Sequence, residues 1–259
     1  MKISCVIICK NNEKIIERTL KSVLWCDEII IVDSGSTDNT LEICNKYNCK
    51  IYQKEFTGFG ELKRYAVSLA ENDWILSIDS DELISEELAK EIKNEINNNF
   101  ENYTGFTFSR ALFFLNKKMR FAGTFDKKIL RVFNKKYGNF NNNLVHESIE
   151  INGKTKHLKN IMYHYSYDSI FDYFKKFNDY TELAAKELYH KKKQKNRLLI
   201  ILRFPFEFIK RFIFQLGFLD GYYGFVWSFF SAFYPVVKYM KVYELFKENK
   251  FKNIDRQVL

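Results

Sequence analysis

Short apolar runs alternate with segments of helical spacing over residues 1–80. Apolar runs of about four to eight residues bounded by polar residues are typical of buried strands, and apolar residues three or four apart are typical of helices. The pattern predicts strands at residues 3–9, 28–33, 50–53 and 74–79, and helices at residues 12–24, 39–47 and 61–70. Strands and helices that alternate with short connections predict a parallel, doubly wound sheet.

The pattern changes after Ile96, where three asparagines, residues 97–99, predict a polar connection. Two aromatic-rich segments, residues 103–110 and 128–133, predict strands, and a third strand pattern ends near residue 165. The phenylalanines between the first two segments are expected in the core or on the floor of an acceptor site; they are Phe113, Phe114, Phe121 and Phe125. Residues 168–190 predict a long helix, which the basic run at residues 191–197 ends.

Carboxylates follow two of the predicted strands: Asp33 follows the second, and Asp79, Asp81 and Glu82 follow the fourth. Open α/β sheets bind ligands at this edge. Two carboxylates one residue apart repel each other unless a cation lies between them, and hard oxygen ligands suit Mg²⁺ or Mn²⁺ holding a diphosphate. The pattern predicts a metal–diphosphate site at Asp79 and Asp81. The alternative is an acidic turn before a helix capped by Ser85, with Asp33 only a turn residue.

Several classes of protein are disfavoured by what the sequence lacks. It has no GxGxxG and no P-loop, which argues against a dinucleotide enzyme and an NTPase. The five cysteines have no paired CxxC or Cys/His spacing, so we expect reduced thiols and a cytoplasmic location. The apolar segment at residues 3–9 is too short for a signal peptide, and no small-residue cleavage site follows it.

Positive charge is concentrated at the C-terminal end of the chain. The net charge is +9, and residues 186–259 hold fifteen Lys and Arg against six Asp and Glu, so residues 1–185 are neutral overall. Aromatic residues crowd residues 198–240, and residues 221–237 are free of charge. Aromatics beside Lys and Arg predict a peripheral membrane surface, since Arg203, Glu207 and Lys210 prevent a simple span. Packing of these aromatics on the catalytic domain or in a dimer is the alternative.

Several strings resemble glycosyltransferase family 2, whose members have the GT-A fold. They are VII (6–8) with NNE (11–13), IVDSGSTD (31–38), FTGFG (56–60) and LSIDSDE (76–82), followed by LVHE (144–147), HYSY (164–167) and LDG (219–221). More narrowly, they resemble the branch that adds glucose to the heptose inner core of lipopolysaccharide or lipooligosaccharide. The resemblance implies a Rossmann-like, mostly parallel sheet with a helical C-terminal extension.

The resemblance also implies roles for individual residues. Asn11, Glu13 and Asp33, with Ser34 beside it, would lie around the uridine of a UDP-sugar. Asp79 and Asp81 would serve the ribose, the diphosphate and a divalent cation, and Lys63 matches a basic position near the nucleotide. Lys10 departs from the family pattern, because a small or hydroxyl residue is commoner there.

An inverting transfer by single displacement needs a carboxylate that takes the proton from the acceptor hydroxyl. Glu147 is the candidate base, with Asp126 and Glu150 next to test. His146 could be a metal ligand, an acceptor contact or a hydrogen-bonded neighbour.

The sequence therefore predicts a GT-A domain over residues 1–165 and a helical, basic and aromatic membrane-associating extension over residues 166–259. The predicted reaction moves a hexose, glucose, from a UDP-sugar to a lipid-linked saccharide, with Mg²⁺ or Mn²⁺ as cofactor. The predicted location is the inner face of the cytoplasmic membrane.

Three alternatives remain open. The first is another cell-envelope or glycan glycosyltransferase that uses a different UDP-hexose. The second is nucleotidyl transfer to a sugar phosphate, which usually needs a glycine-rich loop after the first strand, and residues 10–13 contain no glycine. The third is a nucleic-acid-binding module, favoured by the charge and the 17% aromatic content. The neutral first 185 residues contradict a continuous basic groove, so we expect no nucleic-acid partner. The sequence does not fix the oligomeric state.

Overall fold

The computed structural model describes residues 1–141 and 147–258, without the side chains of residues 126–127 and 248–258. The chain folds as two compact units. We call Met1–Phe113 with Phe125–Ser166 the sheet unit, and Phe114–Thr124 with Tyr167–Leu259 the helical unit.

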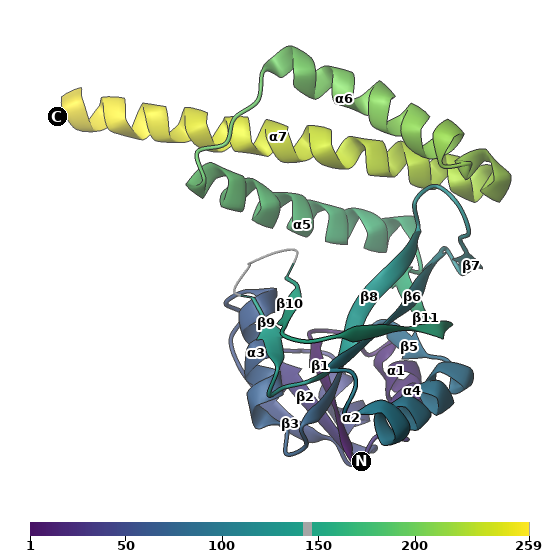
Figure 1. Cartoon of the computed structure of the whole chain (residues 1–259). Coiled ribbons are helices and arrows are strands. Elements are labelled where there is room, and N and C mark those ends of the chain that lie inside the picture. Colours follow the sequence, from purple (N-terminus) through teal and green to yellow (C-terminus); the bar gives the residue numbers. More distant parts are fainter. Residues whose placement is uncertain (142–146, 259) are drawn as a thin grey trace. The chain divides into compact units, whose positions relative to one another are not determined.

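The sheet unit begins with alternating strands and helices, as the apolar pattern predicts (Figure 1). The strands are β1 (Ile3–Cys9), β2 (Glu28–Asp33), β3 (Lys50–Gln53) and β4 (Trp74–Asp79), and the helices are α1 (Ile16–Val23), α2 (Thr40–Asn45) and α3 (Phe59–Leu69). These strands are parallel and adjacent in the order β3-β2-β1-β4. Their carboxyl ends therefore lie along one edge.

Antiparallel strands extend this sheet beyond β4. The later elements are β5 (Glu82–Ile84), α4 (Glu86–Asn99), β6 (Gly105–Phe114), β7 (Lys117–Lys118), β8 (Phe125–Asn134), β9 (Gly138–Phe140), β10 (Ile149–Ile151) and β11 (Thr155–Tyr167). The full order is β3-β2-β1-β4-β8-β6-β11-β5, with β7 on β6, while β9 and β10 form a separate pair. The α/β class and the GT-A arrangement are confirmed.

Helices cover both faces of the sheet. The core on one face contains residues of α1, α2 and α4, such as Leu20, Cys44 and Ile92. The core on the other face contains residues of α3 with Phe140 of β9. All five cysteines are free thiols, and Cys5, Cys9 and Cys44 are buried in the first core. The expectation of reduced thiols used as core residues agrees with this arrangement.

Several predicted boundaries were wrong, each for a local reason. The helix predicted from Asn12 begins at Ile16, because the Asn12 N–H donates to Thr40 Oγ1 at 2.7 Å and is held in a loop. The connection predicted at residues 97–99 continues α4, whose Asn99 side chain donates to Glu95 one turn earlier at 2.8 Å. Phe113 and Phe114 belong to β6, which runs past its predicted end. Ser85 does cap α4, and its hydroxyl accepts from the Leu88 N–H.

The helical unit contains α5 (Ile170–His190), α6 (Arg197–Ile209), a π-helical turn η1 (Lys210–Phe214), a 3₁₀ turn η2 (Gly217–Asp220) and α7 (Gly221–Val258). Figure 1 shows α5, α6 and α7 side by side, and α7 packs against both other helices. The basic run at residues 191–197 separates α5 from α6, as predicted. Asp220, which is buried, accepts from the backbone N–H groups of Arg120 and Phe121 at 3.0 and 2.9 Å, and so fixes residues 114–124 to this unit.

Candidate active site

Asp33 organises the loop that follows β2. The carboxylate is fully buried. Its Oδ2 accepts from the N–H groups of Gly35 and Ser36, both at 3.0 Å, and its Oδ1 accepts from the Ser36 hydroxyl at 2.5 Å and the Cys9 thiol at 3.6 Å. Gly35 has a φ of +91°, which favours a residue without a Cβ. Asp33 therefore fixes this loop in one conformation.

Two other residues predicted near the nucleotide join the same loop. Asn11 Oδ1 accepts from the Thr37 N–H at 2.7 Å, and the Asn11 N–H donates to Ser36 Oγ at 2.9 Å. The Glu13 carboxylate accepts from the Asn39 N–H and side chain, both at 3.1 Å. Ser34 Oγ donates to the Cys9 carbonyl at 3.2 Å. The structure thus brings Asn11, Glu13, Asp33 and Ser34 together at the ends of β1 and β2.

Lys63 of α3 joins two of the other predicted site residues. Its side chain is 3% exposed, and its Nζ lies 2.6 Å from Asp79 Oδ1 and 2.6 Å from Glu147 Oε1. Asp79 ends β4, and Glu147 precedes β10. The carboxylate predicted for the nucleotide and the carboxylate predicted for proton transfer therefore share one ammonium group.

Two arginines that sequence reasoning missed bind the neighbouring carboxylates: Arg131 binds Asp79 and Glu82, and Arg110 binds Glu82. Arg131 of β8 donates from Nη2 to Asp79 Oδ2 at 3.0 Å and to Glu82 Oε1 at 2.8 Å. Arg110 of β6 donates to the same Glu82 oxygen at 2.7 Å. Glu82 is fully buried and also accepts from the Asp79 N–H at 3.0 Å. An arginine inside the apolar run 129–133 is the sequence feature that could have drawn attention to Arg131.

These contacts fix the charge state of the buried groups. Burial raises the pKa of Asp79, but the charges of Lys63 and Arg131 outweigh it and hold that pKa well below its usual range. Burial also raises the pKa of Glu82, but the charges of Arg131 and Arg110 together outweigh it and lower that pKa. Burial lowers the pKa of Arg131, and the two carboxylates raise it further than burial lowers it. At neutral pH all three groups are therefore charged.

Asp81 lies against a histidine of a distant strand. Its Oδ1 is 3.2 Å from His164 Nε2, and the same ring nitrogen is 2.7 Å from the Ser166 hydroxyl. The antiparallel pairing of β5 with β11 places Glu82 opposite His164 and so sets this contact. We call Lys63, Asp79, Asp81, Glu82, Arg110, Arg131 and Glu147 the charged cluster. It holds four carboxylates and three permanently cationic side chains.

Comparison with known proteins identifies the family. The family model described as "Glycosyl transferase family 2" matches residues 4–149. An "Uncharacterized glycosyltransferase" of Rickettsia typhi is 34% identical over 256 residues, which cover 94% of this chain and 87% of that protein. The chain belongs to glycosyltransferase family 2.

Two further relatives of this glycosyltransferase cover nearly its whole length. The "Lipopolysaccharide core biosynthesis glycosyltransferase LpsC" of Rhizobium meliloti is 23% identical over 262 residues, which cover 98% of this chain and 97% of LpsC. The solved structure of S. aureus TarS 1-349 superimposes with a TM-score of 0.45 at 17% identity, covering 96% of this chain and 92% of TarS 1-349.

The residues of this glycosyltransferase can be tested against a divalent cation. Among the side chains that the structure describes, no group of three or more His, Cys, Asp or Glu could hold a metal ion; His146, a candidate ligand from the sequence, lies outside the described residues. Mg²⁺ does not need such a group, because proteins commonly bind it through one or two carboxylates and the phosphates of the substrate. The carboxylate of Asp81 fits this mode, whereas the imidazole of His164 beside it is not a typical Mg²⁺ ligand. Asp79 would first have to give up Lys63 or Arg131.

Proposed function

We propose that this glycosyltransferase moves a hexose, glucose, from a UDP-sugar to a hydroxyl of a lipid-linked saccharide, with inversion. The observation that carries the proposal is the contact of Lys63 with both Asp79 and Glu147 at 2.6 Å. Through Lys63, the candidate base Glu147 is linked to Asp79, a candidate ligand of the diphosphate and its cation. The name of LpsC, a lipopolysaccharide core biosynthesis enzyme, supports a saccharide acceptor of that kind.

The donor would be held along the ends of β1, β2 and β4. The loop fixed by Asp33, with Asn11, Glu13 and Ser34, would form the wall around the uridine. Asp79 would accept from the ribose, since its carboxylate is charged at neutral pH. A divalent cation held by Asp81, with Asp79 if it gives up one of its cationic partners, would offset the charge of the departing diphosphate. Lys63 and Arg131 add positive charge at the same edge, which favours that departure.

Glu147 would accept the proton of the attacking hydroxyl. Lys63 binds its Oε1, so the proton would go to Oε2 of the same carboxylate. Lys63 therefore positions the base while it neutralises Asp79. A single displacement also requires the acceptor hydroxyl to face the anomeric carbon from the side opposite the diphosphate, which inverts the configuration at that carbon.

The helical unit would place the enzyme on the cytoplasmic face of a membrane. Its exposed apolar side chains in α6 and the turns after it are Leu198, Leu199, Ile201, Leu202, Phe206, Ile209, Ile213, Phe214, Leu216, Phe218 and Leu219. Exposed apolar patches of this extent mark interaction surfaces. None of the helices, over the residues described, is long and apolar enough to cross a membrane. Binding in the plane of the interface, beside basic residues such as Arg203 and Lys210, fits both observations.

A donor screen tests the proposed reaction. We expect hydrolysis or transfer from UDP-glucose in the presence of Mn²⁺ or Mg²⁺ and none in EDTA. UDP-galactose and the two UDP-N-acetylhexosamines serve as alternative donors. Turnover of one of these in place of UDP-glucose would show that the proposed sugar is wrong and that the proposed donor site is right. If no UDP-sugar binds or reacts under any of these conditions, the proposed donor is wrong.

A further inference from the structure

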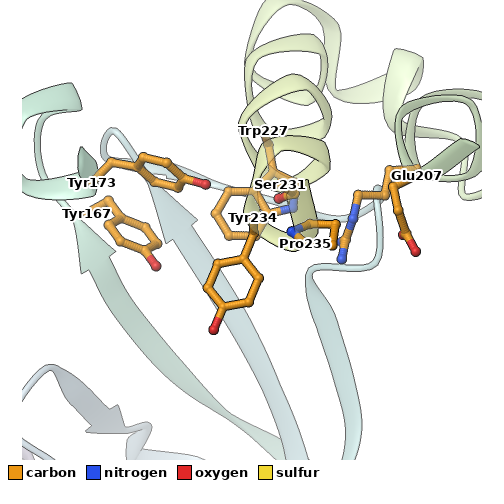
Figure 2. Close-up of a pocket in the computed structure, with 8 residues that line it drawn as sticks. Tyr167, Tyr173, Glu207, Trp227, Ser231, Tyr234 and Pro235 are labelled. Carbon is orange, nitrogen blue, oxygen red and sulfur yellow. The ribbon is translucent and has the colours of Figure 1, made fainter. Parts of the chain in front are cut away.

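The helical unit contains a cavity of about 300 Å³. Three tyrosines and a tryptophan form much of its wall, and Glu207, Arg211 and Ser231 add polar groups. Figure 2 shows the hydroxyl end of Tyr173, from α5, pointing toward Trp227 and Ser231 on α7. None of these residues belongs to the charged cluster. A space of this size is at the lower end of small-molecule sites and suits one small polar group.

Arg211, on η1, is a half-buried cation with no carboxylate within ion-pair distance in the part of the chain that the structure describes, and Glu207 acts on it only at longer range. Its Nη1 donates to the Ala122 carbonyl at 3.2 Å, and its Nε is buried with no hydrogen-bond partner. Glu207, one turn earlier, approaches Lys210 instead, at 3.6 Å. Burial lowers the pKa of Arg211. Arginine does not lose its proton in proteins, so the guanidinium stays charged in this wall.

A second buried donor lies in the same wall. The indole Nε1 of Trp227 has no hydrogen-bond partner among the described residues. Burial raises the pKa of Tyr173, and the charge of Arg211 lowers it in part, so the phenol lies within electrostatic reach of the guanidinium. Buried donors are normally paired with protein or solvent acceptors. Arg211 Nε, Trp227 Nε1 and the Tyr173 hydroxyl can therefore all donate to a ligand that has several hydrogen-bond acceptors.

We propose that this cavity binds an anionic oxygen group, a phosphate or a carboxylate, carried by a small molecule or a lipid head group. A guanidinium binds such groups through charge-assisted hydrogen bonds, and the indole N–H and the hydroxyls of Tyr173 and Ser231 add further donors. Glu207 is the acidic member of the lining, and Lys210 offsets its charge. This site is separate from the proposed transfer reaction and does not depend on it.

Calorimetry on the full chain tests the site with inorganic phosphate, glycerol 3-phosphate and acetate as soluble probes. Phosphatidylglycerol and phosphatidylcholine vesicles serve as lipid probes. We expect Arg211→Gln to weaken binding of the preferred probe at least tenfold. Arg18→Gln is the matched control, because Arg18 lies over the Tyr165 ring at 4.1 Å in the sheet unit, outside the cavity lining, and should leave the affinity unchanged. A nucleotide site also binds phosphate, so the deciding quantity is the difference between the wild type and Arg211→Gln.

The probes distinguish the sources of the anion. Arg211-dependent binding of the soluble probes supports a free small molecule, and Arg211-dependent binding to phosphatidylglycerol vesicles alone supports a lipid head group. Trp227→Phe removes the indole N–H and keeps an aromatic ring, and it should weaken probe binding several-fold. This variant tests the proposed site if Arg211→Gln fails to fold. Wild-type affinity in a folded variant, or no binding of any probe, would overturn the proposal. Glu147→Gln should bind these probes normally, which separates this result from a failure of the proposed transfer.

Discussion

Each unit contains one arginine that is withdrawn from solvent, and the partners of the two differ: Arg131 is buried and Arg211 is half-buried. Arg131 in the sheet unit lies between Asp79 and Glu82, both of which accept from it within 3.0 Å. Arg211 in the helical unit donates to one backbone carbonyl, and the described residues place no carboxylate within ion-pair distance of it. Burying a charge costs free energy unless it is paired. The sheet unit thus balances its buried charge with carboxylates in direct contact, whereas in the helical unit Glu207 acts on Arg211 only at longer range.

Apolar side chains show the same contrast. Among the described residues, nineteen exposed large apolar side chains belong to the helical unit and six to the sheet unit. The sheet unit buries its apolar residues in two cores, one on each face of the sheet. The difference is consistent with the roles proposed above, donor chemistry in the sheet unit and partner contact in the helical unit.

The largest expected effect concerns the base in the sheet unit. Glu147→Gln should keep donor binding and lower the transfer rate by about 10²–10⁴-fold, because the amide cannot accept the proton and general base catalysis is typically of that size. Single-turnover transfer measures the rate, and calorimetry with UDP measures donor binding.

Glu101→Gln is the matched control for this variant, since Glu101 is an exposed carboxylate in the turn after α4 and should react at the wild-type rate. A Glu147→Gln enzyme within a few-fold of the wild type would move the base to another carboxylate. Asp126, whose side chain lies outside what the structure describes, would then be tested first.

Replacing each of these two arginines by methionine compares the two units directly. Arg131→Met should lower the free energy of unfolding by about 3–5 kcal/mol, because it removes the guanidinium that Asp79 shares with the buried Glu82. Arg211→Met should cost about 1 kcal/mol or less, since it removes one hydrogen bond and strands no carboxylate. Urea unfolding measures both. Equal losses in the two variants would contradict the claim that the units balance buried charge differently.

The sequence was sufficient for the elements that have a strong local pattern. Apolar runs located all four parallel strands, and the carboxylates at their ends fell on one edge, because parallel strands place their carboxyl ends together. Asn11, Glu13 and Asp33 also meet there. The local sequence pattern could not show that the Asp33 carboxylate accepts hydrogen bonds from its own loop. That depends on the directions of the Gly35 and Ser36 N–H groups in the folded chain.

Contacts between residues on the antiparallel strands could not be predicted from the sequence. Arg131 reaches Asp79 only because β8 pairs with β4, and His164 reaches Asp81 only because β11 pairs with β5. Both pairings join residues more than 50 positions apart, and their register depends on packing that no short motif encodes. The cavity at Arg211 was unpredictable for the same reason, since it needs α5, η1 and α7 together.

A smaller effect is expected at the proposed metal position. Asp81→Ala should remove the metal-dependent part of UDP affinity, a loss of about tenfold or more, since even outer-shell changes at metal sites cost about 10–100-fold. Calorimetry in EDTA and in Mn²⁺ measures the difference. Asp73→Ala, an exposed aspartate paired with Lys136, is the control and should behave as the wild type. The same UDP affinity in EDTA, in Mn²⁺ and in Asp81→Ala would show that no metal acts there.

The smallest expected effect tests what the exposed apolar residues of the helical unit contact. Phe214→Ser should weaken binding to phosphatidylglycerol vesicles by about tenfold, because Phe214 is 78% exposed and burial of such a side chain contributes about 1.5–3 kcal/mol. Phe100→Ser removes an exposed aromatic from the sheet unit and should leave vesicle binding unchanged. Added salt should also weaken binding, since each basic residue near an anionic surface contributes about 1 kcal/mol. Vesicle flotation measures the binding of both variants and the effect of salt. If the full chain stays with the soluble fraction at low salt, the membrane proposal is wrong. Sedimentation then shows whether a second copy of the chain covers these residues instead.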